Sequence, residues 1–191
     1  MTATSVFSPG PFKSALIVFV LVSGALLMAG WTQKFFASTQ SAPIQLGSEI
    51  VTVSIDLKGK SGLITSRAAK GNAAVVLTVE GIEYDKQPGI YYEVYLNLPK
   101  GAADPDPERP SFIGTLTFFG LKEGAAEGGA KPKQDYLINE AVRGLIANRL
   151  WNPAELKVTF VPRGVISPEG HKLPIRSGAE AKIAKVSISG E

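Results

Sequence analysis

Side chains suited to catalysis or metal binding are scarce in this sequence. Histidine occurs once, as His171 within the polar stretch Pro168–Lys172, and cysteine is absent. The missing thiols exclude disulfides, thiolate metal sites and cysteine nucleophiles. A copper or zinc centre needs several imidazole or thiolate ligands, so a single histidine argues against a self-contained metalloenzyme. We therefore predict no metal and no cofactor, with His171 in a solvated turn.

Acidic residues gather in two groups, which are Glu80, Glu83 and Asp85, and Asp104, Asp106 and Glu108. Loop carboxylates can bind Ca²⁺, but neither group has the spacing and the glycine of a calcium loop. No serine stands in a G-x-S-x-G elbow, and no glycine-rich loop precedes a helix as a phosphate cradle. These patterns favour solvated loops, and we predict that the chain is not an enzyme.

The composition indicates a globular domain with an apolar appendage. Of the 191 residues, 45% are hydrophobic and only 19% are charged. The net charge of +3 comes from scattered lysine and arginine residues, without the basic run typical of nucleic-acid binding. We therefore predict no nucleic-acid partner. The length is sufficient for one domain with its own hydrophobic core.

An uncharged apolar run near the amino terminus predicts a membrane anchor. After a polar tail of residues 1–14, Ala15–Trp31 holds 17 residues without a charge. As a helix this run would extend about 26 Å, which is near the thickness of the hydrocarbon core of a bilayer. We predict a single-pass anchor over residues 15–36, with the lipid bilayer as its partner. Its anchor residues are Phe19, Leu26, Trp31 and Phe35, the last two belonging to an aromatic belt around Lys34.

Two other interpretations of the apolar run remain open. A cleaved signal peptide is also apolar, although its apolar region is usually shorter and ends at a small-residue cleavage site. A buried helix of a soluble protein is the third, although this run has no polar face. For an anchor, lysines on both sides leave the orientation open by charge alone. Because a signal anchor usually places the following domain outside the cytoplasm, we expect a periplasmic or lumenal domain.

The remaining sequence predicts a linker over residues 37–48 and a mainly β domain over residues 49–191. Its centre is the stretch Val75–Leu98, where two apolar runs flank the polar break Asp85–Gly89. In the second run Tyr92, Val94, Leu96 and Leu98 alternate with Tyr91, Glu93, Tyr95 and Asn97, the period of a strand with one buried face. We predict that the two runs pair, with the break as their turn.

Further strands are predicted at Ile50–Leu57, Phe112–Leu121, Leu156–Val161 and Ala181–Ile188, with surface loops over residues 100–109 and 122–133. Asp135 is predicted to cap one amphipathic helix over residues 136–150, where apolar residues recur at helical spacing. The predicted fold is an antiparallel β-sandwich with one short amphipathic helix, preceded by a transmembrane helix.

The order of these segments resembles the C-terminal domain of plant-type polyphenol oxidases and related tyrosinases. The resemblance is carried by V-L-x-V-x-G-I-E at Val76–Glu83, YYEVYLN at Tyr91–Asn97, the F-x-G-T-x-x-F strand, VTFVP at Val158–Pro162 and the closing I-x-x-V-x-I strand. Residues 91–94 would replace the KFDV-type strand of that family. The resemblance implies a β-sandwich-like unit that packs over a di-copper catalytic domain and shields it, with the copper-binding histidines in the other domain.

These observations lead to one primary functional hypothesis and two alternatives. We expect a non-catalytic, membrane-anchored accessory subunit that docks on a larger membrane protein complex of respiratory or photosynthetic type and stabilises it. The predicted partner-binding residues are Tyr91, Tyr95, Asp104, Asp106, Arg109 and Phe112. One alternative is a shield or chaperone of a separately encoded tyrosinase-like copper oxidase. A small-molecule-binding barrel of the lipocalin type is a weaker one.

Overall fold

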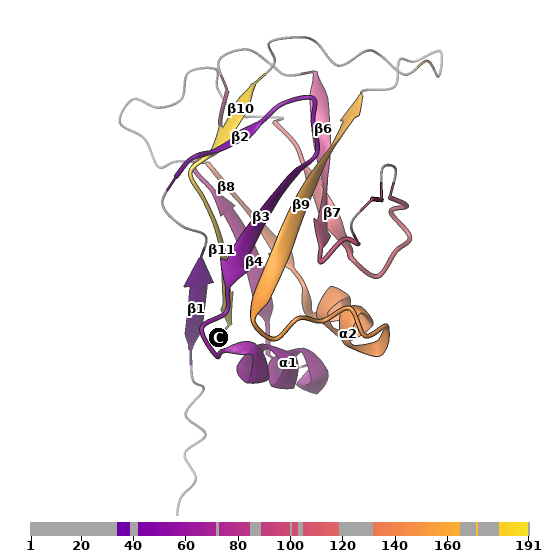
Figure 1. Ribbon diagram of the computed structural model, residues 1–191. Coiled ribbons are helices and arrows are strands. Elements are labelled where there is room, and N and C mark those ends of the chain that lie inside the picture. The colour runs from indigo at the N-terminus through magenta and orange to yellow at the C-terminus, as the bar shows by residue number, and fades with distance from the viewer. Residues whose placement is uncertain are drawn as a thin grey trace, which may run out of the picture. The chain divides into compact units, whose positions relative to one another are not determined.

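The computed structural model describes residues 34–38, 42–71, 73–84, 89–99, 101–102, 105–118, 132–164, 171 and 180–190 (Figure 1). The chain divides into Met1–Trp31 and Thr32–Glu191, and the description that follows concerns the second unit. Its elements are β1 (Phe35–Ser38), β2 (Ile44–Leu46), β3 (Val51–Asp56), α1 (Ser61–Lys70), β4 (Val75–Glu80), β5 (Glu83–Tyr84), β6 (Ile90–Leu96), β7 (Phe112–Leu116), β8 (Lys133–Leu137), α2 (Asn139–Ala147), β9 (Glu155–Gly164), β10 (Ala181–Ile183) and β11 (Lys185–Gly190).

The strands form three antiparallel sheets. One sheet has the order β1-β11-β4-β8, a second the order β3-β9-β6-β7, and a short third the order β2-β10-β5. The apolar side chains of both four-stranded sheets belong to one buried cluster, so the fold is β-sandwich-like (Figure 1). Side chains bridge the sheets where their edges meet. Gln134 Nε2 of β8 donates to the Thr115 carbonyl of β7 at 2.6 Å.

The core follows the alternation in the sequence. Val75, Leu77 and Val79 of β4 are buried, as are Tyr92, Val94 and Leu96 of β6. These six residues are the inward faces that the period of two predicts. The prediction of a mainly β domain is therefore confirmed, with strands β3, β4, β6 and β9 close to the predicted positions.

The predicted pairing within Val75–Leu98 is wrong. Strand β4 pairs with β11 and β8, whereas β6 pairs with β9 and β7 in the other sheet. The chain therefore crosses between sheets after β4 instead of turning back on itself. Of the predicted turn, residues 85–88 lie outside the described residues. The final predicted strand is also divided, since β10 joins one sheet and β11 another on either side of Ala184.

The helices differ from prediction in number and position. Asp135 lies in β8 and does not cap α2, which begins after Ile138 with no side-chain cap from any described residue. Thr78 of the neighbouring strand donates to the Asp135 carboxylate at 2.6 Å, which holds this segment in the sheet. Helix α1 was not predicted. It packs Ile64 and Ala68 into the core beside α2 at one end of the sheets (Figure 1).

The folded unit begins earlier than predicted. The predicted linker contains β2 and part of β1, and Phe35 is buried in β1 opposite Gly190, which corrects its assignment to the anchor. The anchor residues Phe19, Leu26 and Trp31 lie outside the described residues, so that part of the prediction is untested. Within the described ranges, no helix is both long enough and apolar enough for a transmembrane span.

Candidate docking site

The residues predicted to bind a partner, apart from Asp104, lie in strands β6 and β7 and in the segment of residues 105–111 between them. Tyr95 has a fully buried side chain, so it forms no part of an exposed face. Tyr91 and Phe112 are half-buried, whereas Asp106 and Arg109 are exposed. Asp104 lies outside the described residues. We call residues 105–111, which pass over the outer side of β6, the strap.

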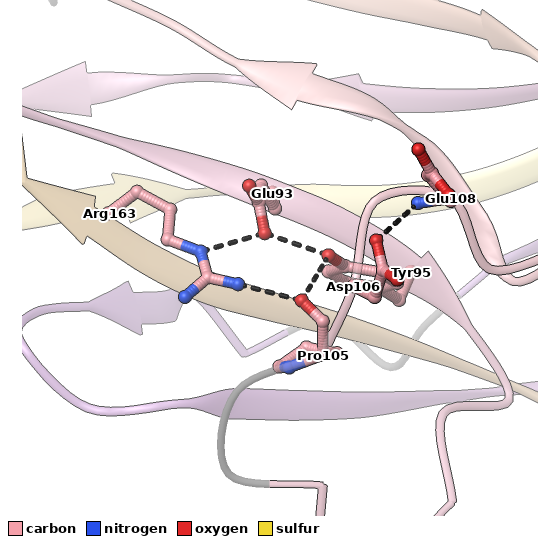
Figure 2. Close-up of polar contacts among 6 residues, drawn as sticks. All are labelled: Glu93, Tyr95, Pro105, Asp106, Glu108 and Arg163. Carbon is pink, nitrogen blue, oxygen red and sulfur yellow. Dashed lines mark hydrogen bonds and ion pairs between the residues drawn. The ribbon is translucent and has the colours of Figure 1, made fainter.

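The side chains of Arg163, Glu93 and Tyr95 hold the strap on the sheet (Figure 2). Arg163 of β9 donates from Nε to Glu93 Oε2 at 2.7 Å and from its terminal nitrogen to the Pro105 carbonyl at 2.8 Å. The Tyr95 hydroxyl lies 2.7 Å from the same carboxylate oxygen and 3.1 Å from the Pro105 carbonyl. Its single proton can be donated to one of these acceptors at a time. The network explains why Glu93 and Tyr95, predicted to face solvent, are buried.

The electrostatics of this network are those of a buried ion pair. The side chains of Arg163 and Glu93 are 14% and 9% exposed. Burial raises the pKa of the Tyr95 hydroxyl and the Glu93 carboxylate raises it further, against the opposing effect of Arg163. Tyr95 therefore stays protonated and acts as a hydrogen-bond donor to the charged carboxylate. The network fixes the position of the strap on the sheet.

The strap is also fixed at its exposed side and its end. The Asp106 carboxylate accepts a bond from the Glu108 amide at 2.9 Å, and the Ser111 carbonyl accepts one from the Leu96 amide at 2.7 Å. A Cβ atom at Gly144 of α2 would lie 2.6 Å from Pro110 Cβ, so strap and helix are in close contact. Asp106 and Arg109 are thus presented on a segment of fixed shape.

The structure also has a groove of about 540 Å³, which we call the Asn97 groove. It is lined by residues from the start of β3, from β9, from the segment after β6 and from the connection after α2, which are Ile50, Thr52, Asn97, Leu98, Pro99, Gly101, Ala102, Leu150, Asn152, Lys157 and Thr159. Its volume falls in the range of ligand-binding pockets, about 300–1,000 Å³.

Asn97 holds the walls of this groove together. Its Oδ1 accepts a bond from the Lys157 amide at 2.8 Å, and its Nδ2 donates to the Leu150 carbonyl at 3.1 Å. Its backbone amide donates to the Lys157 carbonyl at 2.8 Å, and its φ angle is +46°. Asparagine tolerates this left-handed conformation better than most residues. The prediction placed Asn97 on the outer face of a strand and missed this role, although an asparagine at a strand end is a signal for such a turn.

The lining combines apolar and polar side chains. Ile50 and Leu150 are 43% and 41% exposed. The hydroxyls of Thr52 and Thr159 share a hydrogen bond at 3.0 Å, and Lys157 pairs with Glu155 at 3.1 Å. Such a surface can bury an apolar side chain and hydrogen-bond the polar group next to it.

The described residues outside this region add little chemistry. His171 is exposed. Glu80, from one predicted acidic group, pairs with Lys185 at 3.3 Å between adjacent strands. Within the ranges that the structure describes, no group of three or more His, Cys, Asp or Glu side chains could hold a metal ion.

Comparison with known sequences gives two findings. A family model described as a domain of unknown function, DUF7868, matches residues 34–189. A chloroplastic polyphenol oxidase from Malus domestica is 35% identical over 89 residues, which are 44% of this chain and 14% of that protein. This similarity confirms the resemblance to polyphenol oxidases, of which the present chain matches a small part.

Solved structures give related matches. Latent apple tyrosinase is 22% identical with a TM-score of 0.48, and the match covers 78% of this chain and 27% of that one. A recombinantly expressed latent aurone synthase, a polyphenol oxidase, is 17% identical with a TM-score of 0.46, covering 78% and 25%.

Proposed function

This chain belongs to the family of the domain of unknown function DUF7868, and on that premise we propose that it is a non-catalytic accessory domain that docks on another protein through the Asn97 groove. The observation that supports this proposal is the way in which Asn97 fixes the shape of the groove. Asn97 adopts a left-handed backbone and uses both ends of its amide to fix walls that leave Ile50 and Leu150 exposed.

The strap supports the same role. Asp106 and Arg109 are exposed on it, and the buried Arg163–Glu93 pair fixes it. Exposed charged residues of this kind are typical of the polar rim of a protein interface. A preformed surface also loses less conformational entropy on binding than a mobile one.

The partner we favour is a larger membrane protein complex, of respiratory or photosynthetic type, which the domain would stabilise from the extracytoplasmic side. The uncharged run Ala15–Trp31 would anchor the chain and confine the domain to the membrane surface. Confinement raises the effective concentration of the domain near a membrane partner, so a modest interface suffices.

A second partner is favoured by the sequence similarity to part of a polyphenol oxidase. In this version the domain covers a separately encoded di-copper oxidase of the tyrosinase type, as the resemblance implies for the attached domain. No residue of this chain would contribute to the copper site. Co-expression that leaves the latency and copper loading of such an oxidase unchanged would remove this alternative.

The groove is tested by one charge-introducing substitution and a matched control. Leu150→Glu places a carboxylate in the groove wall, and Leu137→Glu places one at a site that is 69% exposed and outside the groove. The partner is first isolated with the full chain from native membranes in mild detergent. In titrations of that partner, we expect Leu150→Glu to weaken binding by about thirtyfold, the size of an interface hot spot of about 2 kcal/mol. Equal affinities of the two variants would refute the proposal.

A further inference from the structure

The surface formed by α1 and the start of β1 is basic. Residues 57–71 contain Lys58, Lys60, Arg67 and Lys70 but no acidic residue, and Lys34 directly precedes β1. Lys34, Lys58 and Lys70 are exposed. The nearest acidic residue in sequence is Asp56, whose carboxylate accepts a bond from the Lys58 amide at 2.9 Å.

Contacts between α1 and β1 place these charges at one end of the folded unit. The Lys60 ammonium donates to the Phe36 carbonyl. The Arg67 guanidinium lies 5.4 Å from the centre of the Phe35 ring. The first residues of β1 are therefore held against α1, at the end of the sheets where α1 and α2 lie (Figure 1).

Two large apolar side chains are exposed on the same two elements. Phe36 of β1 is 47% exposed, with the Lys185 ammonium 4.9 Å from the centre of its ring, and Leu63 of α1 is 36% exposed. Lysines beside exposed aromatic and aliphatic side chains are typical of surfaces that bind the interface of an anionic membrane. The lysines are attracted to the lipid headgroups, and the apolar side chains can enter the boundary below them.

The sequence connects this surface closely to the apolar run. Trp31 ends the uncharged run Ala15–Trp31, and Phe35 begins β1. Four residue steps span at most about 14 Å. A bilayer that held the run would therefore lie within reach of the residues around Phe35.

We propose that Lys34, Phe36, Lys58, Leu63 and Lys70 form a basic face that lies on the anionic lipid headgroups of a membrane. The proposal rests on the anchor of the proposed function and is independent of docking through the Asn97 groove. An acidic protein surface would satisfy the charges equally well, but the short connection to an uncharged apolar run favours the bilayer.

The absence of cysteine from the chain makes this face directly measurable. Ser66→Cys places a single dye on the exposed side of α1. Gln45→Cys places the same dye on the exposed side of β2, at the opposite end of the sheets (Figure 1). The full chain is reconstituted in vesicles of phosphatidylcholine, with or without phosphatidylserine, that contain a headgroup-linked quencher.

We expect the dye at position 66 to be quenched strongly in vesicles with phosphatidylserine and the dye at position 45 to be quenched weakly in both. Lys58→Gln and Lys70→Gln should each lower the equilibrium constant between molecules whose basic face lies on the membrane and molecules whose face has detached. The expected decrease is about fivefold, which corresponds to about 1 kcal/mol per lysine. Added salt should lower it as well, because it screens these charges.

The possible failures are distinguishable. A chain that does not float with the vesicles would overturn the anchor and the basic face together. A chain that floats, with both dyes quenched equally, would overturn the face and leave the anchor standing. Protection of position 66 that requires an added protein partner would assign the face to that protein and also overturn the proposal. Titrations of the Leu150→Glu variant test the groove separately.

Discussion

At the scale of single residues, the molecule uses its polar side chains to fix backbone segments. Glu93, Tyr95 and Arg163 hold the strap, and Asn97 holds the walls of the groove. Alternation alone assigned Glu93, Tyr95 and Asn97 to a solvent-facing side. It could not reveal that a segment ten residues further along the chain covers that side.

Arg163→Met is expected to destabilise the fold by about 3–5 kcal/mol, because it leaves the Glu93 carboxylate buried without its cation. The double variant Glu93→Gln/Arg163→Met removes both charges and keeps an acceptor for the Tyr95 hydroxyl. It should be more stable than Arg163→Met alone in denaturant unfolding. The single variant Glu93→Gln is measured as well. If the double variant loses as much unfolding free energy as the two single variants together, the two side chains act independently.

Asp135 gives a prediction for the pH dependence of stability. The hydrogen bond from Thr78 and the charge of Lys133 hold the pKa of its carboxyl below the ordinary 3.8. Its contribution to stability is therefore present above that pH and is lost as the pH falls through the lower value of the folded state. Wild type should exceed Asp135→Asn in stability by less than about 1 kcal/mol at neutral pH, because the pair is partly exposed.

The free energy of unfolding of both proteins, measured as the pH is lowered, checks this prediction. The difference between wild type and Asp135→Asn should shrink to zero well below pH 3.8. A difference that stays constant, or grows on acidification, would mean that the carboxylate is not stabilised by its neighbours.

At the scale of elements, the sequence predicted the positions of the strands better than their pairing. Strands β3, β4, β6 and β9 follow from apolar alternation, which is a local signal. The pairing of β4 with β11 joins residues more than a hundred positions apart, and no local pattern records it. Helix α1 escaped prediction because it contains Gly62 and the β-branched Ile64 and Thr65, and no described side chain caps its start.

Two helical glycines should respond in opposite ways to alanine. Gly144→Ala should destabilise despite the better helix propensity of alanine, because its Cβ would lie 2.6 Å from Pro110. Gly62→Ala in α1 is the matched control, since nothing lies within 4 Å of its Cβ position. It should stabilise by about 0.5–1 kcal/mol.

Thermal unfolding of both variants measures this contrast. Pro110→Gly combined with Gly144→Ala should recover part of the loss, because the contacting Cβ atom of residue 110 is then absent. Stabilisation by Gly144→Ala alone would mean that strap and helix are not in firm contact.

At the scale of the whole molecule, the folded unit presents two surfaces with different chemistry. The Asn97 groove is lined by apolar and polar side chains, whereas the end with α1 and β1 is basic. The resemblance to a polyphenol oxidase domain was predictable from the sequence because the strands that carry it are local motifs. The groove was not, because its lining comes from four separate segments of the chain.

The central claim is that the Asn97 groove contacts the partner, and cross-linking from a single cysteine tests it most directly. Ala102→Cys lies in the groove lining and Gln45→Cys lies on β2 outside it, in a chain that otherwise has no cysteine. With a short cross-linker in native membranes, we predict a discrete adduct of higher mass from Ala102→Cys and none from Gln45→Cys. An assembly that forms normally but gives no adduct from position 102, or equal adducts from both positions, would contradict this account.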